Sequence, residues 1–422
     1  MTLSPSIEAS EAAHASLLRQ SELLAELIRI PSIIEHEHAI VERVAEHIRT
    51  LGYTPTLIPH DPARLTAHPL AQSPISTREG RASIAVRIQG AGRGPSLAIN
   101  THLDTVPAGP ETSWTHPPFS GFIDEERGVI HGRGAMDDKA GVTIALSLME
   151  LLSRRPPLRG DVVFHFVLED ETTGNGTLLC LENGFTADAA LIIDGTRPDK
   201  AIDRHAGHLQ LDVRVQGSPA SISVAHMGVN AAEILAEFAL ELRAAVRSCN
   251  QSLQTPWDRF PSPFQCVTQA LRAVGEPLTV PENAEGTFWI TFPPPAALDD
   301  MRALVARTIR EFSQAQGLQG RITHIENGFC SEPVHTNASA LSAALLETAE
   351  RLQMPPIDIS PSTGLSDMRL FGAFDIPCLL YGPGTGYNPH RADECYHLSD
   401  LPRMTAFYHA FAQRWCGIAE NG

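Results

Sequence analysis

Between residues 96 and 193, short apolar runs alternate with stretches of helical spacing, and this alternation constrains the fold more than any other feature. The runs at 96–100, 161–168 and 189–193 are nearly continuous in apolar residues, and predicted helices at 141–153 and 177–183 separate them. Strands of this kind are buried on both faces, and strands that alternate with helices form an α/β sheet. In such sheets, ligands bind at the carboxyl ends of the strands.

The chain has 422 residues, which is longer than a single hydrophobic core usually grows. From about residue 204 the pattern changes to a strand at 208–216, a helix at 229–247, strands at 265–272 and 286–292, a helix at 298–316 and a strand at 321–326. This βαββαβ order is typical of a small α+β domain. The sequence therefore predicts an α/β domain at 1–203 and 332–422, interrupted by an inserted α+β domain at 204–331.

The flanking segments complete the expected α/β domain. Helices are predicted at 6–29 and 35–51, the second ended by Gly52, and a single strand at 83–88 in the polar stretch 54–95. After the insertion we expect a helix at 339–352, a strand at 378–381 and a closing helix at 399–415.

Composition limits the partners. The 49 acidic residues outnumber the 32 basic ones, and a net charge of −17 disfavours nucleic acid and anionic membranes as partners. The seven cysteines show no paired spacing, which favours a reduced, cytoplasmic protein. The N-terminus lacks the pattern of a secretory signal, and no uncharged apolar stretch approaches the ~18 residues of a membrane span.

Polar side chains follow each of the three central strands. His102 and Asp104 come after the first, the acidic run 169–171 after the second and Asp194 after the third. Imidazole and carboxylate are ligands that zinc prefers, and a carboxylate that is not a ligand can orient an imidazole. Taken singly, each has an ordinary explanation: a satisfied core pair, a solvated acidic turn or a helix N-cap.

Two further residues complete a set of candidate ligands. Asp137 lies in a glycine-rich segment, and His390 lies in a loop where a lone histidine more often faces solvent. With His102, Glu171 and Asp194 they give five ligands. Five is a sensible number for two metal ions that lie about 3.5–4 Å apart and share one carboxylate.

In chain order, the motifs are His102-x-Asp104, Trp114 with Pro118-Phe119, Gly132-Arg-Gly-Ala-x-Asp137-x-Lys139, Glu169-Asp-Glu171-Thr-Thr-Gly-Asn-Gly176, Asp194, Gly228-Val-Asn-Ala231, Ser366-Asp-Met-Arg369, Tyr381-Gly-Pro-Gly384 and His390-x-x-x-Glu394. This series resembles the M20 family of metallopeptidases and deacylases. Within the family it is most similar to the acetylornithine deacetylase and succinyl-diaminopimelate desuccinylase-like branch. The resemblance extends from about residue 20 to residue 415.

The resemblance implies a dinuclear site, with zinc as the expected metal and cobalt as the alternative. Asp137 would bridge the two ions, Glu171 and His390 would complete one shell, and His102 and Asp194 the other, with Asp104 orienting His102. It implies hydrolysis of the amide bond of a small N-acylated amino acid or related amide. The inserted domain would be a lid that also forms a homodimer interface.

The sequence departs from the family pattern at two positions. Asp170 stands where the family has its glutamate base, and Glu169 is the alternative if the loop shifts by one residue. Ser221 stands where relatives place a lid histidine that stabilises the oxyanion, and His226 is the alternative. Arg369 would pair either with a substrate carboxylate or within a structural salt bridge.

Two functional hypotheses follow. The first is a dizinc amidohydrolase, and the second is a degenerate member that keeps its metals but binds a ligand with altered or lost hydrolysis. A nucleotide-binding protein is disfavoured because Gly132-x-Gly134 lacks the third glycine of that fingerprint. We expect Lys139 to have a structural and not a catalytic role. Trp289 stands where relatives of this branch often carry an arginine, and this difference bears on which substrate is bound.

Overall fold

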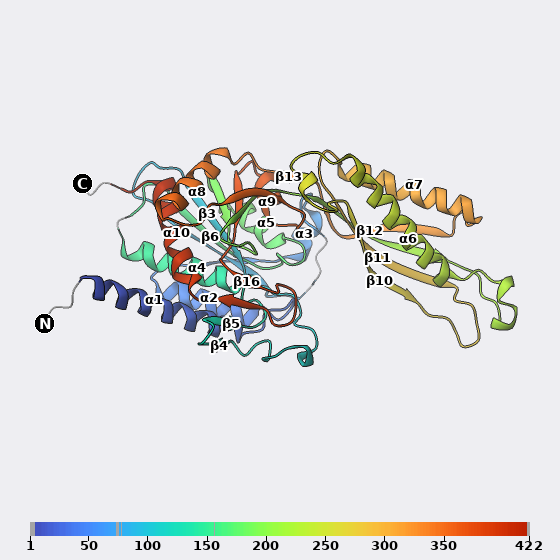
Figure 1. Ribbon diagram of the computed structural model, residues 1–422, viewed down its shortest axis with the longest axis horizontal. Helices are drawn as coiled ribbons and strands as arrows, with labels where there is room; N and C mark the ends of the chain where they lie inside the picture. The colour runs from blue at the N-terminus through green and yellow to red at the C-terminus, as the bar shows by residue number, and fades with distance from the viewer. Residues whose placement is uncertain (1–4, 73–75, 77, 156, 420–422) are drawn as a thin grey trace. The chain divides into compact units, whose positions relative to one another are not determined.

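The structure is a computed structural model that describes residues 5–72, 76, 78–155 and 157–419. It forms two compact units (Figure 1): a larger one of Met1–Asp203, Thr336–Ser360 and Ser366–Gly422, and a smaller one of Arg204–His335 and Pro361–Leu365. The smaller unit takes in residues 332–335 and 361–365, which lie outside the predicted insertion. Val334 pairs with His205, and the Ser362 carbonyl accepts a hydrogen bond from Ala206, so backbone pairing ties both segments to the start of the insertion.

A sheet organises the larger unit. Its strands follow the order β1 (Thr56–Pro59), β2 (Ala82–Ile88), β6 (Val162–Val167), β3 (Leu97–His102), β7 (Ala189–Ile192), β15 (Cys378–Tyr381) and β8 (Lys200–His205), with β14 (Asp358–Ser362) paired to β8. Strand β13 (Val334–His335) pairs with Arg204 and His205 and belongs with them to the smaller unit. The central strands β6, β3, β7 and β15 are parallel, and every residue in them is buried. Both faces of the sheet are therefore covered, and the predicted α/β class is confirmed.

The covering helices are α1 (Pro5–Ile28), α2 (His38–Thr50), α4 (Lys139–Arg154), α5 (Asn175–Glu182), α8 (Ser339–Arg351), α9 (Met368–Ala373) and α10 (Asp400–Cys416). Helices α1, α4 and α10 contact one another (Figure 1) and bury Leu24, Leu146 and Phe407 in one apolar core. Apart from α9, which the sequence reading missed, these helices lie where their apolar spacing predicts them.

The prediction of a single strand between residues 54 and 95 is wrong, because the segment before β2 has further secondary structure. It also forms β1 and the short helix α3 (Pro62–Ala67). Strand β1 buries only Ile58, and α3 depends on the Asp61 side chain, which accepts a hydrogen bond from Ala63 N at 2.9 Å. Elements this short carry too little apolar periodicity to be found from sequence.

A small four-stranded sheet lies in the larger unit, in the order β16 (Gly386–Tyr387), β17 (Cys395–His397), β5 (Val129–His131) and β4 (Phe122–Asp124). Pairing of β17 with β5 joins the loop that carries His390 to the loop that carries Asp137. These loops are far apart in sequence, so this sheet is what brings the two residues together.

The smaller unit is an antiparallel sheet of β10 (Gln265–Ala273), β11 (Asn283–Phe292), β9 (Gly207–Gln216) and β12 (Ile322–Ser331). Helices α6 (Ala231–Ser248) and α7 (Leu298–Gln316) pack on it and bury Leu211, Phe238 and Phe288. The order of elements is the predicted βαββαβ. Among the residues that the structure describes, no helix in either unit has the length and apolarity needed to cross a membrane.

Candidate metal centre

Three neighbouring parallel strands end at one edge of the large sheet and bring the first candidate ligands together. His102 is the last residue of β3, and the acidic run 169–171 and Asp194 follow β6 and β7, its two neighbours. His102 Nε2 lies 3.9 Å from Asp170 Oδ2 and 3.8 Å from Asp194 Oδ1. The structure therefore brings these side chains together at the carboxyl edge of the sheet.

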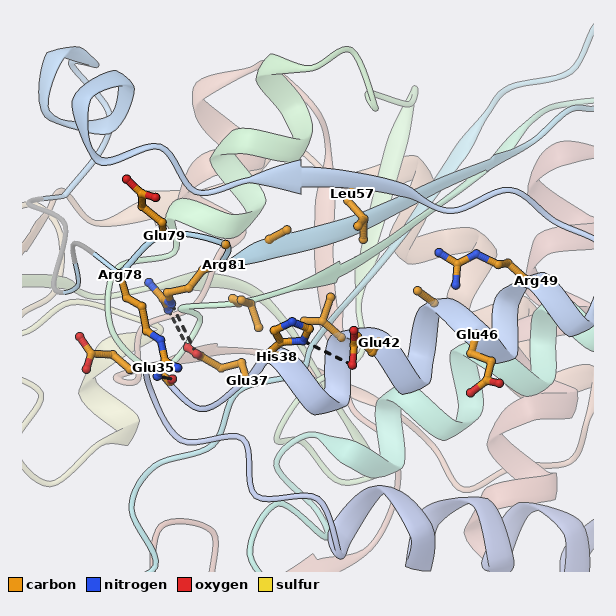
Figure 2. Close-up of a pocket in the computed structure, with 15 residues that line it drawn as sticks. Glu35, Glu37, His38, Glu42, Glu46, Arg49, Leu57, Arg78, Glu79 and Arg81 are labelled. Atoms are coloured by element: carbon orange, nitrogen blue, oxygen red, sulfur yellow. Dashed lines mark hydrogen bonds and ion pairs between the residues drawn. The ribbon is translucent and has the colours of Figure 1, made fainter.

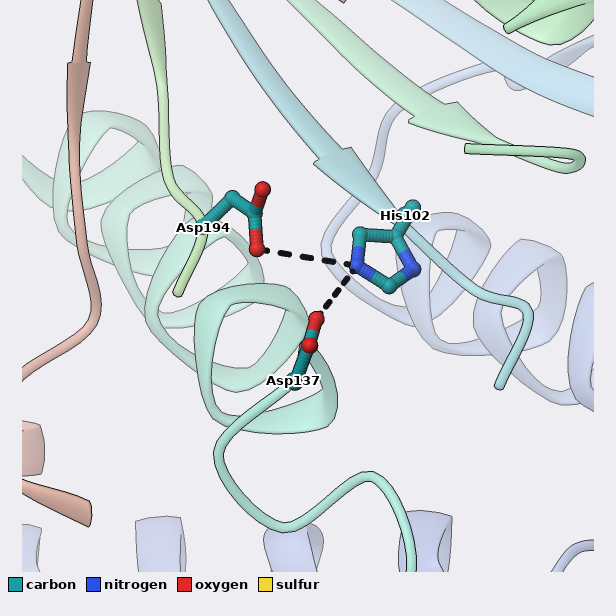
Figure 3. A group of neighbouring side chains, drawn as sticks. All are labelled: His102, Asp137 and Asp194. Atoms are coloured by element: carbon teal, nitrogen blue, oxygen red, sulfur yellow. Dashed lines mark hydrogen bonds and ion pairs between the residues drawn. The ribbon is translucent and has the colours of Figure 1, made fainter. Parts of the chain in front are cut away.

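Asp137 lies between two groups of candidate ligands. Its Oδ1 is 2.9 Å from His102 Nε2, and its Oδ2 is 3.1 Å from His390 Nε2. Figure 3 marks the contact between Asp137 and His102 with a dashed line. His390 Nε2 is also 2.9 Å from Glu171 Oε2. The ligand atoms of His102, Asp137 and Asp194 lie within 4.8 Å of one another, as do those of Asp137, Glu171 and His390. Each oxygen of one carboxylate thus faces its own group, as a ligand shared by two ions requires.

The electrostatics of the site fit divalent cations. Burial raises the pKa of Glu171 to about 7, and the nearby charge of Asp137 adds to this rise. Hydrogen bonds to Asp137 and Glu171 raise the pKa of His390 to about 10, so protons on histidine balance the carboxylates. A cation can take the place of these protons. The nitrogen–oxygen separations of 2.9–3.8 Å bracket the edge of about 3.3 Å expected for a tetrahedral zinc site.

The loop that carries Asp137 is held by Glu394, which is fully buried. Glu394 Oε2 accepts hydrogen bonds from Arg133 Nη1 at 2.6 Å and from Gly134 N at 2.9 Å. Its Oε1 accepts from Met136 N at 2.9 Å and from Asp137 N at 3.2 Å. The sequence marked Glu394 only as part of a motif, and this anchoring role was missed because a buried glutamate cannot be distinguished from an exposed one without the fold.

Asp104 lies behind His102, where the resemblance places it. His102 Nδ1 lies 2.9 Å from the backbone oxygen of Asp104 and 3.7 Å from its Oδ1, so the shorter contact comes from the main chain. The Asp104 carboxylate also accepts hydrogen bonds from the backbone nitrogens of Asp170 and Glu171, both at 3.3 Å. Backbone contacts of this kind leave no sequence signal.

The alternative that Glu169 serves as the base is wrong. Its carboxylate is 2% exposed, pairs with Arg81 and lies 3.3 Å from His60 Nδ1. His60 Nε2 is 2.8 Å from Ser83 Oγ, so the three form an acid–histidine–serine chain. Ser83 is fully buried and also accepts a hydrogen bond from Leu168 N, so no substrate reaches it. Asp170 remains the candidate base.

Arg369 and Gly382 have structural roles near the site. Arg369 Nη2 donates to the backbone oxygen of Thr173, and burial lowers the pKa of its guanidinium, which favours the structural reading of this residue. Gly382 N donates to Thr196 Oγ1, and a Cβ at position 382 would overlap the Thr196 backbone. Glycine therefore lets β15 approach the loop that carries Asp194. Lys139 Nζ donates to Ile30 O at 2.7 Å, which agrees with a structural role.

The remaining predicted residues belong to the smaller unit. Ser221 and His226 are both exposed, and Ser221 Oγ lies 3.0 Å from Ser223 Oγ. Trp289 Nε1 donates to His208 Nδ1 at 2.8 Å, and burial lowers the pKa of His208 to about 3. The proposed roles of Ser221 and His226 stay predictions.

The family model for peptidase family M20/M25/M40 matches residues 98–414, which includes all five candidate ligands. The chain belongs to this family. Its candidate centre is accordingly that of an M20 metallohydrolase.

Solved structures share the fold. Human carnosine dipeptidase 1 superposes with a TM-score of 0.76 at 12% identity, over 97% of this chain and 98% of that one. The M20 family metallo-carboxypeptidase Sso-CP2 of Sulfolobus solfataricus gives a TM-score of 0.72 at 18% identity, over 94% and 99% of the two chains. The YXEP protein of Bacillus subtilis, described as a dinuclear metal binding peptidase, gives 0.65 at 16% identity, over 97% and 100%. The TM-scores establish that these proteins share the architecture of this chain, and at identities of 12–18% the similarity extends to the fold alone.

Proposed function

We propose that this chain is a dizinc hydrolase that cleaves the amide bond of a small N-acylated amino acid or small peptide. The observation that carries the proposal is Asp137, whose two carboxylate oxygens face two separate groups of histidine and carboxylate ligands. His102 and Asp194 would hold one ion, and Glu171 and His390 the other. The nitrogen and oxygen donors suit zinc, with cobalt as an alternative.

His102, Asp137, Asp194, Glu171 and His390 would hold the two ions, whose chemistry would be to polarise the substrate carbonyl and to lower the pKa of a water. The chain supplies the proton acceptor: Asp170 lies in the turn after β6, and its Oδ2 lies 3.9 Å from His102 Nε2. A base at this position takes a proton from the attacking water and passes it to the leaving nitrogen. The His390 side chain is 52% exposed whereas that of His102 is 2% exposed, so substrate would enter from the His390 side.

The substrate class rests on two lines of support. The sequence motifs resemble the acetylornithine deacetylase and succinyl-diaminopimelate desuccinylase-like branch, which favours an N-acylated amino acid. Structures of similar fold include proteins described as a carnosine dipeptidase and a tripeptidase, which favours a short peptide. Both classes present one amide to the centre, so one assay panel covers them.

A second candidate function is ligand binding with altered or lost hydrolysis. Asp170 favours it, because aspartate is one methylene shorter than the glutamate of relatives and a misplacement of about 1 Å can cost on the order of 10²-fold in rate. Ser221 favours it too, because a missing oxyanion donor typically costs about 10²–10³-fold.

We further propose a homodimer that forms through residues 204–331 and acts in the cytoplasm on a small molecule. Support for the compartment comes from the cysteines: none of the seven forms a disulfide in the described part of the chain. The acidic net charge of −17 argues against a nucleic-acid partner.

The test is an assay of the zinc- or cobalt-loaded protein against N-acetyl, N-formyl and N-succinyl amino acids and unblocked dipeptides. Asp170→Asn should lower kcat by about 10²–10⁴-fold if Asp170 is the base, and Asp61→Asn, at an exposed helix cap, should not. Asp170→Glu should raise kcat if the short side chain limits the rate. Metal and ligand binding without turnover of any substrate would favour the second candidate, and failure to bind metal would overturn both.

A further inference from the structure

A groove of about 580 Å³ crosses the larger unit between α2, strands β1 and β2, and the segment that leads into β2 (Figure 2). Its lining includes the apolar residues Val41, Ala45 and Leu57 together with exposed charged side chains. Arg81 also lines the groove, yet its side chain is only 5% exposed. A charged group at this depth needs partners, because an unpaired buried charge is strongly destabilising.

Arg81 joins two buried carboxylates. Its Nη2 lies 2.6 Å from Glu37 Oε1, a contact marked in Figure 2, and its Nη1 bonds to Glu169 Oε1. Glu37 and Glu169 are each 2% exposed. Burial acts to lower the pKa of Arg81, but its hydrogen bond with Glu37 and the charge of Glu169 outweigh burial, so the guanidinium stays charged. The cation thus connects the start of α2 to the loop after β6.

Glu169 in turn closes the turn that presents Asp170 and Glu171. Its backbone oxygen accepts hydrogen bonds from Thr173 N at 2.9 Å and Gly174 N at 2.6 Å. Its carboxylate accepts from Thr173 Oγ1 and, at 3.3 Å, from Asn175 Nδ2. Glu169 also has a φ of 70°, a left-handed conformation that a non-glycine residue keeps only when its surroundings hold it.

We propose that Arg81 is a positioning residue: by bridging Glu37 to Glu169 it fixes the turn that places Glu171 as a metal ligand and Asp170 as the base. The metal part of this inference depends only on the candidate centre, and the part about Asp170 rests on the proposed function. Asp194 follows another strand and makes no contact with this turn among the described hydrogen bonds and ion pairs. Loss of Arg81 should therefore affect the two ions unequally.

The experiment compares Arg81→Ala with Arg78→Ala. Arg78 lines the same groove but is exposed, and it donates to the backbone oxygen of Glu35 and not to Glu169. Stepwise zinc affinity of the metal-free proteins would be measured by calorimetry and chelator competition. Arg81→Ala should weaken one of the two ions by about 10–100-fold and leave the other unchanged, whereas Arg78→Ala should change neither.

Ligand substitutions show which of the two ions Arg81→Ala weakens. Glu171→Gln should remove the binding step that Arg81→Ala weakens, and Asp194→Asn should remove the other step. If a hydrolysed substrate is found, kcat of Arg81→Ala should fall by about 10²-fold with little change in KM, because Asp170 is displaced while the substrate surface stays.

The groove allows chemical rescue. Truncation of Arg81 leaves a cavity that opens into solvent through the groove, so guanidinium at millimolar concentration can enter between Glu37 and Glu169. It should restore the weakened metal step in Arg81→Ala and have no effect on Arg78→Ala. Urea, which has a similar shape and no charge, should not restore it.

Equal weakening of both ions in Arg81→Ala, or equal rescue by urea and guanidinium, would overturn the inference in favour of general stabilisation. If Arg81→Ala does not fold, Glu169→Gln keeps the side-chain volume, removes the charge that Arg81 holds and should show the same selective loss. The metal readout stands even if no substrate is hydrolysed, so the inference and the proposed function fail separately.

Discussion

Replacing Glu394 with glutamine tests whether the candidate centre is held by its buried anchor. The carboxylate accepts four hydrogen bonds, from Arg133 Nη1 and from the backbone nitrogens of Gly134, Met136 and Asp137. Glutamine has nearly the same shape, but its amide group turns one acceptor into a donor that faces other donors. It also leaves the Arg133 guanidinium, which is 2% exposed, without its counter-charge.

The size of the effect follows from these contacts. Two hydrogen bonds are lost with their donors left buried, at about 1–3 kcal/mol each, and breaking a buried ion pair costs about 3–5 kcal/mol. These terms overlap because they describe the same side chain, so we expect Glu394→Gln to destabilise the larger unit by about 3–5 kcal/mol. Whichever oxygen the amide nitrogen replaces, the loop that carries Asp137 loses one or two of its three backbone anchors, at Gly134 or at Met136 and Asp137. Both zinc affinities should therefore fall, by about 10–100-fold.

A single melting midpoint does not isolate one unit of a two-unit protein, so the assay is hydrogen exchange of the β3, β5 and β6 amides in the metal-free state. Zinc affinity is measured separately. Glu26→Gln is the control: Glu26 makes a two-bond pair with Arg43, but its side chain is 46% exposed, so its loss should cost about 0–1 kcal/mol. A Glu394→Gln effect no larger than the control, with zinc affinity unchanged, would refute the reasoning.

Three further predictions concern pH, packing and metal content. Burial lowers the pKa of His165 to about 4, so the folded state resists a proton that the unfolded state accepts below about pH 6.5; stability of the metal-free protein should fall by about 2–3 kcal/mol between pH 6.5 and 4.5. His165→Gln should abolish that share of the decline, and an unchanged pH profile in urea unfolding would contradict it. Gly382→Ala should destabilise by about 1–3 kcal/mol or more and weaken zinc binding, because its Cβ overlaps Thr196 beside Asp194; wild-type values for both would contradict this. Exhaustive chelation followed by zinc titration should give two ions per chain in the wild type and one in Asp194→Asn, measured by elemental analysis, and equal content in both would exclude Asp194 as a ligand.

Much of the fold could be read from the sequence because its elements carry strong local patterns. The buried strands β3, β6, β7 and β15 are continuous apolar runs, and helices such as α4, α7 and α10 show regular spacing over many turns. The elements that were missed, including α3, α9, β16 and β17, are a few residues long, and distant partners stabilise them.

The sequence by itself determined which residue types stand after the central strands and in two further loops, and so the candidate ligands His102, Asp137, Glu171, Asp194 and His390. Only the tertiary structure decided which role each of the carboxylates around them has. The Asp104 carboxylate accepts hydrogen bonds from backbone nitrogens of the loop after β6, and Glu169 forms an ion pair with Arg81. Glu394 anchors the loop that carries Asp137. The physical reason is that a carboxylate becomes a ligand, a base or an anchor according to its burial and its nearest donors, and those donors come from segments far away along the chain.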